Sequence, residues 1–217
     1  MTTLGEVQRL LTGRVKEVEG AKGLFSAIAK HPRHGRVRLG STGLEGDEHA
    51  HPQFHGGLEK AVHHYPLDHY AYWREHVPGF QRLDAPGAFG ENISTEGITE
   101  NDLCVGDILG VGSAQLQVSQ GRAPCGILDA RFRFAGMADA VERTRYTGWY
   151  YRVLQEGEIA QGDPITLLER SHPEWTLEAA QYVLYNDRQN KRAIAAILEI
   201  PTLSAEWRAI FTTLSKQ

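Results

Sequence analysis

The sequence predicts a mainly β protein with added α-helices, in which a β-barrel domain over residues 1–169 precedes a three-helix region over residues 170–217. Short β-branched or alternating runs, separated by glycine turns, follow one another up to about Leu168. After Arg170 the pattern changes to three stretches with helical spacing. With 217 residues the chain is long enough to bury a sizeable core.

The predicted strands are short and are bounded by glycine, aspartate or proline. Gly-Asp pairs at 46–47, 106–107 and 162–163 lead into or follow such runs, as turn chemistry predicts. Many short strands at irregular spacing favour a closed or nearly closed barrel over a sheet of βαβ units. The strands are expected within residues 11–18, 26–30, 35–40, 60–65, 90–95, 106–112, 114–120, 149–154 and 163–169.

Helices are expected both inside the strand-rich part and after it. Residues 66–77 begin with Pro66, which suits a first helical turn, and stop before Pro78. A second internal helix is predicted over 136–146. The C-terminal helices are expected over 176–185, 190–200 and 204–217, with Thr176 and Ser204 as N-caps. The last of them carries one apolar stripe, formed by Trp207, Ile210, Phe211 and Leu214.

Composition narrows the class of protein. A net charge of −4 argues against a general nucleic-acid binder, which needs a basic surface. The two isolated cysteines fit a reducing compartment better than a disulfide framework. Neither a signal-peptide pattern nor a long apolar run occurs in the sequence, so we expect a cytoplasmic protein without membrane segments.

The stretch VSQGRAPCGILD, residues 118–129, places Cys125 after a predicted strand and a Gly-Arg-Ala-Pro turn. A thiolate is the form that attacks or binds metal, and the nearby Arg122 favours it. A free cysteine is equally often a small buried hydrophobe. Cys125 is therefore a candidate nucleophile, metal ligand or packing residue, whereas Cys104 is expected only to pack.

Residues 43–65 are rich in histidine but lack zinc-ligand spacing. His63 and His64 are adjacent on a predicted strand and must point to opposite faces, while His49 and His51 are expected to be solvated. His55-Gly56-Gly57 is different, because glycines let backbone N–H groups approach an anion such as a phosphate. A tight turn uses the same residues.

Two more polar pairs are candidates for ligand binding. Ser26 and Lys30 would lie on one side of a strand and could hold an anionic ligand, or simply form an exposed strand face. Glu91 and Asn92 stand at a strand start, where they could hydrogen-bond a heterocycle or close a turn.

The order of these motifs resembles the MOSC domain over about residues 12–169. The similarity rests on Ser26-x-x-x-Lys30, GLEGDE, HGGLEKAVHHYP, GAFGENIST, QVSQGRAPC and the final run GWYYRVLQEGEIAQGDPITLLER. The three predicted C-terminal helices resemble the 3-alpha region of YiiM-type bacterial proteins. The resemblance implies a MOSC-type β-barrel with a small helical appendage.

The resemblance also implies a cofactor, the molybdenum cofactor (Mo-molybdopterin). The cysteine that ligates molybdenum in the family falls on Cys125, a soft ligand suited to such a metal. The cofactor is anionic, so cationic and backbone groups would converge on it. The cofactor-binding residues implied are Ser26, Lys30, Asp47, His55, Gly56, Gly57, Glu91, Asn92 and Arg122.

The implied activity is reduction of N-hydroxylated compounds, such as N-hydroxylated purine bases, to amines. The sequence lacks flavin and iron–sulfur motifs, so a separate reductase is expected to supply electrons. His55 and the histidines before it are candidate proton donors. Gly121 replaces a proline that is usual in YiiM-type proteins, which bears on substrate preference. The C-terminal helices are expected to cover the site or to form a homodimer contact.

Two other functions remain open at this point. A non-catalytic carrier would hold the cofactor, or sulfur on Cys125, for delivery to another enzyme. A thiol hydrolase would use Cys125 as nucleophile and His55 as base, without molybdenum.

Overall fold

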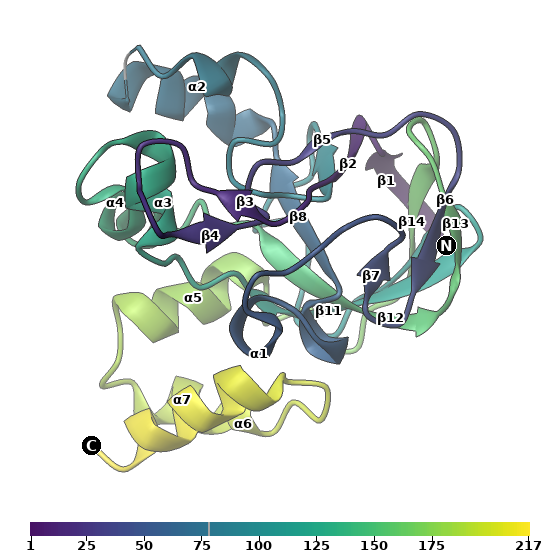
Figure 1. Ribbon diagram of the computed structural model, residues 1–217. Helices are drawn as coiled ribbons and strands as arrows, with labels where there is room; N and C mark the ends of the chain where they lie inside the picture. The colour runs from purple at the N-terminus through teal and green to yellow at the C-terminus, as the bar shows by residue number, and fades with distance from the viewer. Residues whose placement is uncertain (78) are drawn as a thin grey trace.

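The structure is a computed structural model that describes residues 1–77 and 79–217. Most of its strands lie in one nine-stranded sheet (Figure 1). β8 and β9 run parallel, and the other neighbouring strands of this sheet run antiparallel. In order of pairing the strands are β1 (Thr2–Glu6), β14 (Pro164–Glu169), β10 (Ile108–Val111), β11 (Ala114–Gly121), β12 (Trp149–Gln155), β8 (Val62–Pro66), β9 (Ile93–Thr95), β2 (Arg9–Thr12) and β5 (His31–Pro32).

The sheet curls back on itself, but strand pairing does not close it into a barrel. β1 and β2 are separated by two residues, Val7 and Gln8, yet lie near opposite ends of the strand order. Val7 N–H donates to Asp163 O next to β14 at 3.0 Å, and Gln8 N–H donates to Ser94 O of β9 at 2.9 Å. Within the described residues, however, β1 and β5 remain the unpaired ends of the order. The predicted closed barrel is therefore not confirmed.

Two small sheets accompany the large one. One consists of β13 (Gly157–Ile159), β6 (Val37–Gly40) and β7 (Gly43–Leu44), and the other of β3 (Lys16–Glu17) and β4 (Phe25–Ser26). The strand predicted over 26–30 is wrong beyond Ser26, because the chain leaves β4 there and turns, with Lys30 N–H donating to Ile28 O at 3.0 Å. β1 was not predicted, since its TTLGE sequence lacks a clear apolar alternation.

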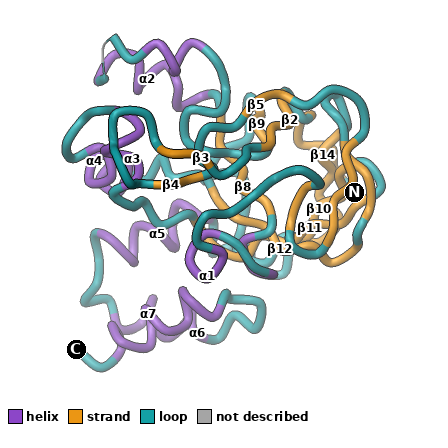
Figure 2. Tube along the Cα trace, in the orientation of Figure 1, coloured by secondary structure: helices purple, strands orange, loops and turns teal. Residues whose placement is uncertain are grey.

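The C-terminal region is helical, as expected. α5 (Leu177–Tyr185), α6 (Lys191–Leu198) and α7 (Ala205–Ser215) follow the last strand. Thr176 and Ser204 are confirmed as N-caps, each accepting a hydrogen bond from the backbone N–H three residues on at 3.1 Å. Side chains of these helices share one hydrophobic core with the sheet, including Leu177, Ile194 and Trp207. Figure 2 shows these helices beside the strands, with loops between them.

A second core lies under the internal helices. α2 (Asp68–His76), η2 (Gln81–Asp84), α3 (Ile127–Phe132) and α4 (Met137–Thr144) surround it. α2 and α4 confirm the two predicted internal helices. Pro66, expected in the first helical turn, is instead the last residue of β8, and α2 begins at Asp68 after the N-cap Leu67. Pro78, before which the helix was expected to stop, lies outside the described residues. α1 (Pro52–His55), η1 (Leu58–Lys60) and α3 were not predicted, since each is too short for a clear helical period.

None of the described helices combines the length and apolar character needed to cross a bilayer.

Candidate functional site

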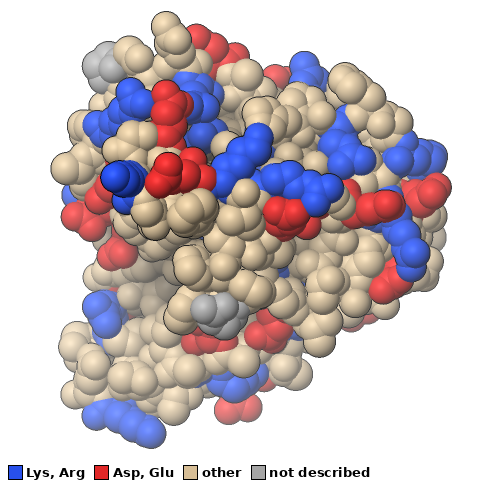
Figure 3. Space-filling model, in the orientation of Figure 1, with Lys and Arg blue, Asp and Glu red and all other residues tan. Residues whose placement is uncertain are grey.

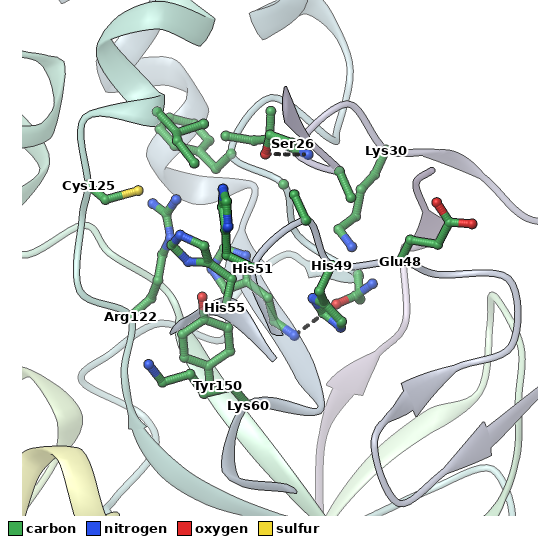
Figure 4. Close-up of a pocket in the computed structure, with 18 residues that line it drawn as sticks. Ser26, Lys30, Glu48, His49, His51, His55, Lys60, Arg122, Cys125 and Tyr150 are labelled. Carbon is green, nitrogen blue, oxygen red and sulfur yellow. Dashed lines mark hydrogen bonds between the residues drawn. The ribbon is translucent and has the colours of Figure 1, made fainter. Parts of the chain in front are cut away.

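Loops from distant parts of the chain meet around a pocket that contains Cys125. Figure 4 shows Cys125 pointing into this pocket from one side and Lys30 from the other, with His51, His55 and Arg122 between them. The lining side chains come from residues 26–30, 48–55, 60–63, 89–92, 122–127 and from Tyr150. The structure thus brings together most of the candidates that the sequence scatters over a hundred positions.

Cys125 lies in the turn that links β11 to α3. Arg122 N–H donates to Gly148 O at 3.0 Å, which holds the start of this turn against the segment before β12. The Cys125 carbonyl accepts the Leu128 N–H at 2.9 Å, so α3 begins directly after the cysteine. The Cys125 thiol is free and half-buried, and it faces the pocket (Figure 4). This placement fits a ligand or a nucleophile better than a packing residue.

Cys104 has the opposite environment. It is fully buried, and its Sγ lies 3.7 Å from Pro173 O. Burial, followed by the negative charge of Asp107, raises the pKa of the Cys104 thiol to about 11. Its expected packing role agrees with this burial.

Arg122 and His63 form an unpaired polar wall at the base of the pocket. Both are buried, at 6% and 5% exposure. Arg122 Nη1 and His63 Nε2 have no hydrogen-bond partner among the described residues. Burial and the charge of Arg122 lower the pKa of His63 well below its ordinary value. Because buried polar groups are nearly always satisfied, these two atoms are the groups at this site that a ligand or a water molecule can still satisfy.

Lys30, Asp47 and Asn92 form a second wall, the paired wall. Lys30 faces Cys125 across the pocket, while Asn92 lies beside His63, whose backbone N–H donates to Asn92 Oδ1 at 3.0 Å. Lys30 Nζ donates to Asp47 Oδ1 at 2.6 Å, and Asp47 also accepts from Gly13 N–H at 2.7 Å and from Asn92 Nδ2 at 2.9 Å. Burial lowers the pKa of Lys30, and Asp47 opposes that shift. Lys30 and Asn92 line the pocket, whereas Asp47 lies behind Lys30 and is not among the lining residues.

Glu91 acts as an internal support. Its buried carboxylate accepts from Tyr70 Oη at 2.5 Å, from Gly87 N–H at 2.6 Å and from Phe89 N–H at 3.0 Å. These bonds fix the 87–90 segment, which presents Phe89 and Gly90 to the pocket. The structure thus places Glu91 away from the pocket lining that Asn92 joins.

The His55-Gly56-Gly57 segment contributes mainly its histidine. His55 ends α1 and lines the pocket, where burial and then Arg122 lower its pKa. Gly56 N–H donates back to Pro52 O at 3.2 Å, so it is already used within α1. Gly57 has φ 89° and follows the helix outside the lining. A backbone anion cradle from Gly56, as hypothesised, is therefore not formed.

Ser26 lines the pocket from the end of β4, and its Oγ accepts the Ile28 N–H at 3.1 Å. Sequence reasoning missed Lys60 and Tyr150, which also line it; Lys60 Nζ lies 5.8 Å from the centre of the Tyr150 ring. His49 and His51, expected to be solvated and to be candidate proton donors, line the pocket too. Burial, then Lys30, lowers the pKa of His49.

The histidine pair on β8 follows the predicted alternation. His63 faces the pocket, while His64 is buried on the other face, hydrogen-bonded to Tyr151 Oη at 2.9 Å and Thr95 Oγ1 at 2.7 Å. Burial lowers the pKa of His64 to about 3. His64 is thus a neutral core residue.

The C-terminal helices contact residues that lie behind or beside the lining of the pocket. A Cβ at Gly121 would lie 2.9 Å from Gln181 Cδ of α5 and 3.0 Å from Trp207 of α7. Glu206 of α7 forms an ion pair with Lys60, which lines the pocket. The helices therefore buttress both the Arg122–Cys125 turn and the Lys60 side of the site.

Across residues 1–77 and 79–217, histidine, cysteine and carboxylate side chains form no group of three or more that could hold a metal ion. The zinc interpretation of the histidine-rich segment thus finds no support. A metal bound here would take most of its ligands from a cofactor and few from the protein.

Comparison with known proteins places the chain in a family. The MOSC domain matches residues 51–166, and the YiiM-like 3-alpha helix domain matches residues 175–214. Uncharacterized protein YflK of Bacillus subtilis (strain 168) is 39% identical over 195 residues, covering 90% of this chain and 86% of that protein. A protein named Reductase from Gibberella moniliformis (strain M3125 / FGSC 7600) is 38% identical over 200 residues, which are 91% of this chain but 35% of that protein.

A solved structure agrees over nearly the full length. The crystal structure of YiiM from Geobacillus stearothermophilus superposes with a TM-score of 0.81 at 34% identity, covering 97% of this chain and 98% of that one. The shared fold, both domain matches and the identity of the relatives lead to one conclusion: the chain belongs to the MOSC-domain family and carries the YiiM-like 3-alpha region.

Proposed function

We propose that this chain binds the molybdenum cofactor and reduces N-hydroxylated compounds, such as N-hydroxylated purine bases, to amines, using electrons from a separate reductase. The observation that carries the proposal is the half-buried Cys125 thiol at a pocket whose base holds unpaired Arg122 and His63 atoms. The name of the fungal relative, Reductase, supports the class of reaction.

The residues present fit such a cofactor. Cys125 offers one soft sulfur ligand, which suits a metal that arrives with a dithiolene. Arg122 is a buried cation with an unpaired Nη1, suited to an anionic group, and His63 Nε2 can hydrogen-bond a polar edge. Lys30 also lines the pocket, but its ammonium is already paired with Asp47, so it maintains the shape of the pocket. When bound, the cofactor would supply a metal centre that exchanges two electrons with the substrate.

The overall conversion requires protons as well as electrons. For each R–NH–OH converted to R–NH2 and H2O, two electrons and two protons are consumed. His49 and His55 line the pocket and are the proposed proton donors. Burial together with Lys30 or Arg122 lowers their pKa values, which favours the neutral imidazole at neutral pH. A bound anion offsets that positive charge, so the histidines would hold protons more readily in the loaded site.

The remaining lining groups shape the space for a substrate. Ile28, Phe89 and Ile127 provide apolar surface on which a heterocycle can pack. Glu91 fixes the segment that carries Phe89, and the C-terminal helices support the turn that carries Cys125. The chain thus holds the reacting groups on supported segments.

The test is turnover of protein made in a host that synthesises the cofactor. Wild type, Cys125→Ala and the matched control Cys104→Ala are given dithionite and an N-hydroxylated purine, and the amine is quantified by chromatography. Wild type and Cys104→Ala should produce amine, and Cys125→Ala should lose more than the roughly 10–100-fold typical of outer-shell substitutions. Equal turnover in Cys125→Ala contradicts the proposal. A loaded wild type without turnover favours the carrier function instead.

A further inference from the structure

A second pocket lies outside the Cys125 site, between η2, α3 and the β3–β4 turn. We call it the arginine pocket. Its lining includes three arginines, three phenylalanines and Glu19. The arginines are Arg82, Arg131 and Arg133, and the phenylalanines are Phe80, Phe132 and Phe134. The lining carries three arginines against one carboxylate, an excess of positive charge in a chain whose net charge is −4. Figure 3 shows basic and acidic side chains gathered on the face over α2, α3 and α4.

The arginines are held in different ways. Arg82 and Arg133 each form an ion pair with Glu19, and both remain well exposed, at 40% and 62% of the side chain. Arg131 is more buried and donates to Ala88 O at 3.4 Å and to Gly87 O at 3.3 Å. One carboxylate thus pairs with two exposed guanidinium groups. The remaining positive charge can attract an acidic partner.

The arginine pocket and the Cys125 pocket share one wall. α3 contributes Ile127 to the Cys125 pocket and Phe132 to the arginine pocket. Phe132 in turn packs against Phe89, which lines the Cys125 pocket, with ring centroids 4.9 Å apart. On the other side Phe80 stacks on Phe132 at 4.4 Å. A row of three rings in contact therefore runs from one pocket to the other.

We propose that the arginine pocket is the docking site of an acidic electron-transfer protein, which delivers electrons to the Cys125 pocket across the Phe80–Phe132–Phe89 wall. The inference rests on the proposed function, since that reaction needs an external reductant. Each turnover oxidises the docked protein by two electrons in total. In the substrate the N–O bond breaks and an N–H bond forms, with two protons, passed on by His49 and His55 and replaced from solvent, completing amine and water. The fungal Reductase, of which the matched region is 35%, has room for such a donor in its own chain.

The experiment measures binding and turnover separately. The probes are a purified flavodoxin and a purified [2Fe–2S] ferredoxin, both acidic, titrated calorimetrically into cofactor-loaded protein at low and high salt. The double variant Arg82→Glu/Arg133→Glu reverses the two exposed charges. Glu19→Gln removes the carboxylate charge that pairs with both arginines. Arg38→Glu is the matched control, because Arg38 lies on β6 in an exposed ion pair with Glu156.

At least one probe should bind wild type, more weakly as salt rises. The double reversal should raise its dissociation constant by about tenfold or more, while Glu19→Gln lowers it and Arg38→Glu leaves it unchanged. Turnover driven by the bound probe should fall in the double variant, whereas dithionite-driven turnover, which needs no docking, persists.

Failure of both probes to bind, or equal binding by all variants, overturns the docking site. If dithionite turnover persists in that case, the proposed reduction stands and only the docking site is lost. Absence of dithionite turnover in loaded wild type overturns the proposed function itself.

Discussion

The two walls of the Cys125 pocket differ in how their buried polar groups are satisfied. On the paired wall, Lys30, Asp47 and Asn92 bond to one another and to backbone groups. On the unpaired wall, Arg122 Nη1 and His63 Nε2 have no partner within the described residues. Leaving a buried polar group unsatisfied costs about 1–3 kcal/mol, so the unpaired wall is destabilising unless a ligand completes it. The paired wall therefore maintains the shape of the pocket, and the unpaired wall is where binding is expected.

The largest effect on stability should come from breaking the paired wall. Asp47→Asn leaves the Lys30 ammonium buried without its counter-ion, which typically costs about 3–5 kcal/mol. Urea unfolding at neutral pH measures the change. Glu48→Gln, which breaks the exposed Arg14 ion pair, is the control and should unfold close to wild type. An Asp47→Asn protein as stable as that control would show that the two walls do not differ as described.

The buried His64 of β8 predicts how the stability of the protein depends on pH. His64 is neutral in the folded protein down to a pKa of about 3, whereas an unfolded histidine takes up a proton near its ordinary value of 6.5. The unfolded state binds more protons in this range, so stability is lost as the pH falls below about 6.5. Between there and about pH 4 the loss is on the order of 3 kcal/mol.

The free energy of unfolding of wild type and His64→Gln, measured against pH, tests this expectation. The variant loses two hydrogen bonds at every pH, but its dependence on pH should be shallower. Parallel curves would mean that His64 does not contribute to the acid instability.

A smaller loss of stability is expected where the helices support the unpaired wall. Gly121→Pro introduces the residue that the resemblance to YiiM-type proteins implies there, but here its Cβ would meet Gln181 and Trp207. Overpacking of this kind costs about 1–3 kcal/mol and would displace the following Arg122. Thermal unfolding and cofactor content measure the two effects. Gly126→Ala, in the same turn but with open space around its Cβ, should match wild type. Unchanged values in Gly121→Pro would contradict the proposed support.

The smallest effect on stability should come from the unpaired wall itself. Arg122→Gln removes a buried guanidinium whose Nη1 lacks a partner, so the free energy of unfolding should change by less than about 1 kcal/mol or even increase. Its cofactor content should nevertheless fall sharply, because an anion-binding cation is gone. The opposite pattern, with stability lost and cofactor retained, would assign Arg122 to packing.

The regular part of the fold was predictable because its local signals are strong. The strands β10 and β11 were predicted as two runs within 106–112 and 114–120, and the structure pairs them as a hairpin, with Val111 opposite Ala114 across a two-residue turn and φ 58° at Gly112. α3 gave no such signal, since six residues are less than two helical turns. Barrel closure was inferred from strand number, but closure depends on pairing between distant edges, which local patterns do not encode.

For the site, the sequence identified side chains but not their partners. Cys125, Arg122, Lys30 and Ser26 do line one pocket, as the order of motifs implied. The pairing of Lys30 with Asp47 joins residues 17 positions apart through an irregular loop, and no periodicity predicts it. His63 and His64 were correctly expected to face opposite sides. The sequence did not show which of the two histidines faces the pocket. That follows from the packing of β8 between β12 and β9.

The most direct test of the central claim, that Cys125 and the unpaired wall hold a molybdenum cofactor, is the molybdenum and pterin content of purified protein. Wild type, Cys125→Ala and Cys104→Ala are made in a host that synthesises the cofactor, and metal is measured by elemental analysis and pterin by fluorescence after oxidation. Near-stoichiometric molybdenum and pterin in wild type and Cys104→Ala, with loss of molybdenum in Cys125→Ala, is the predicted result. A well-folded wild type that carries neither molybdenum nor pterin would contradict the account.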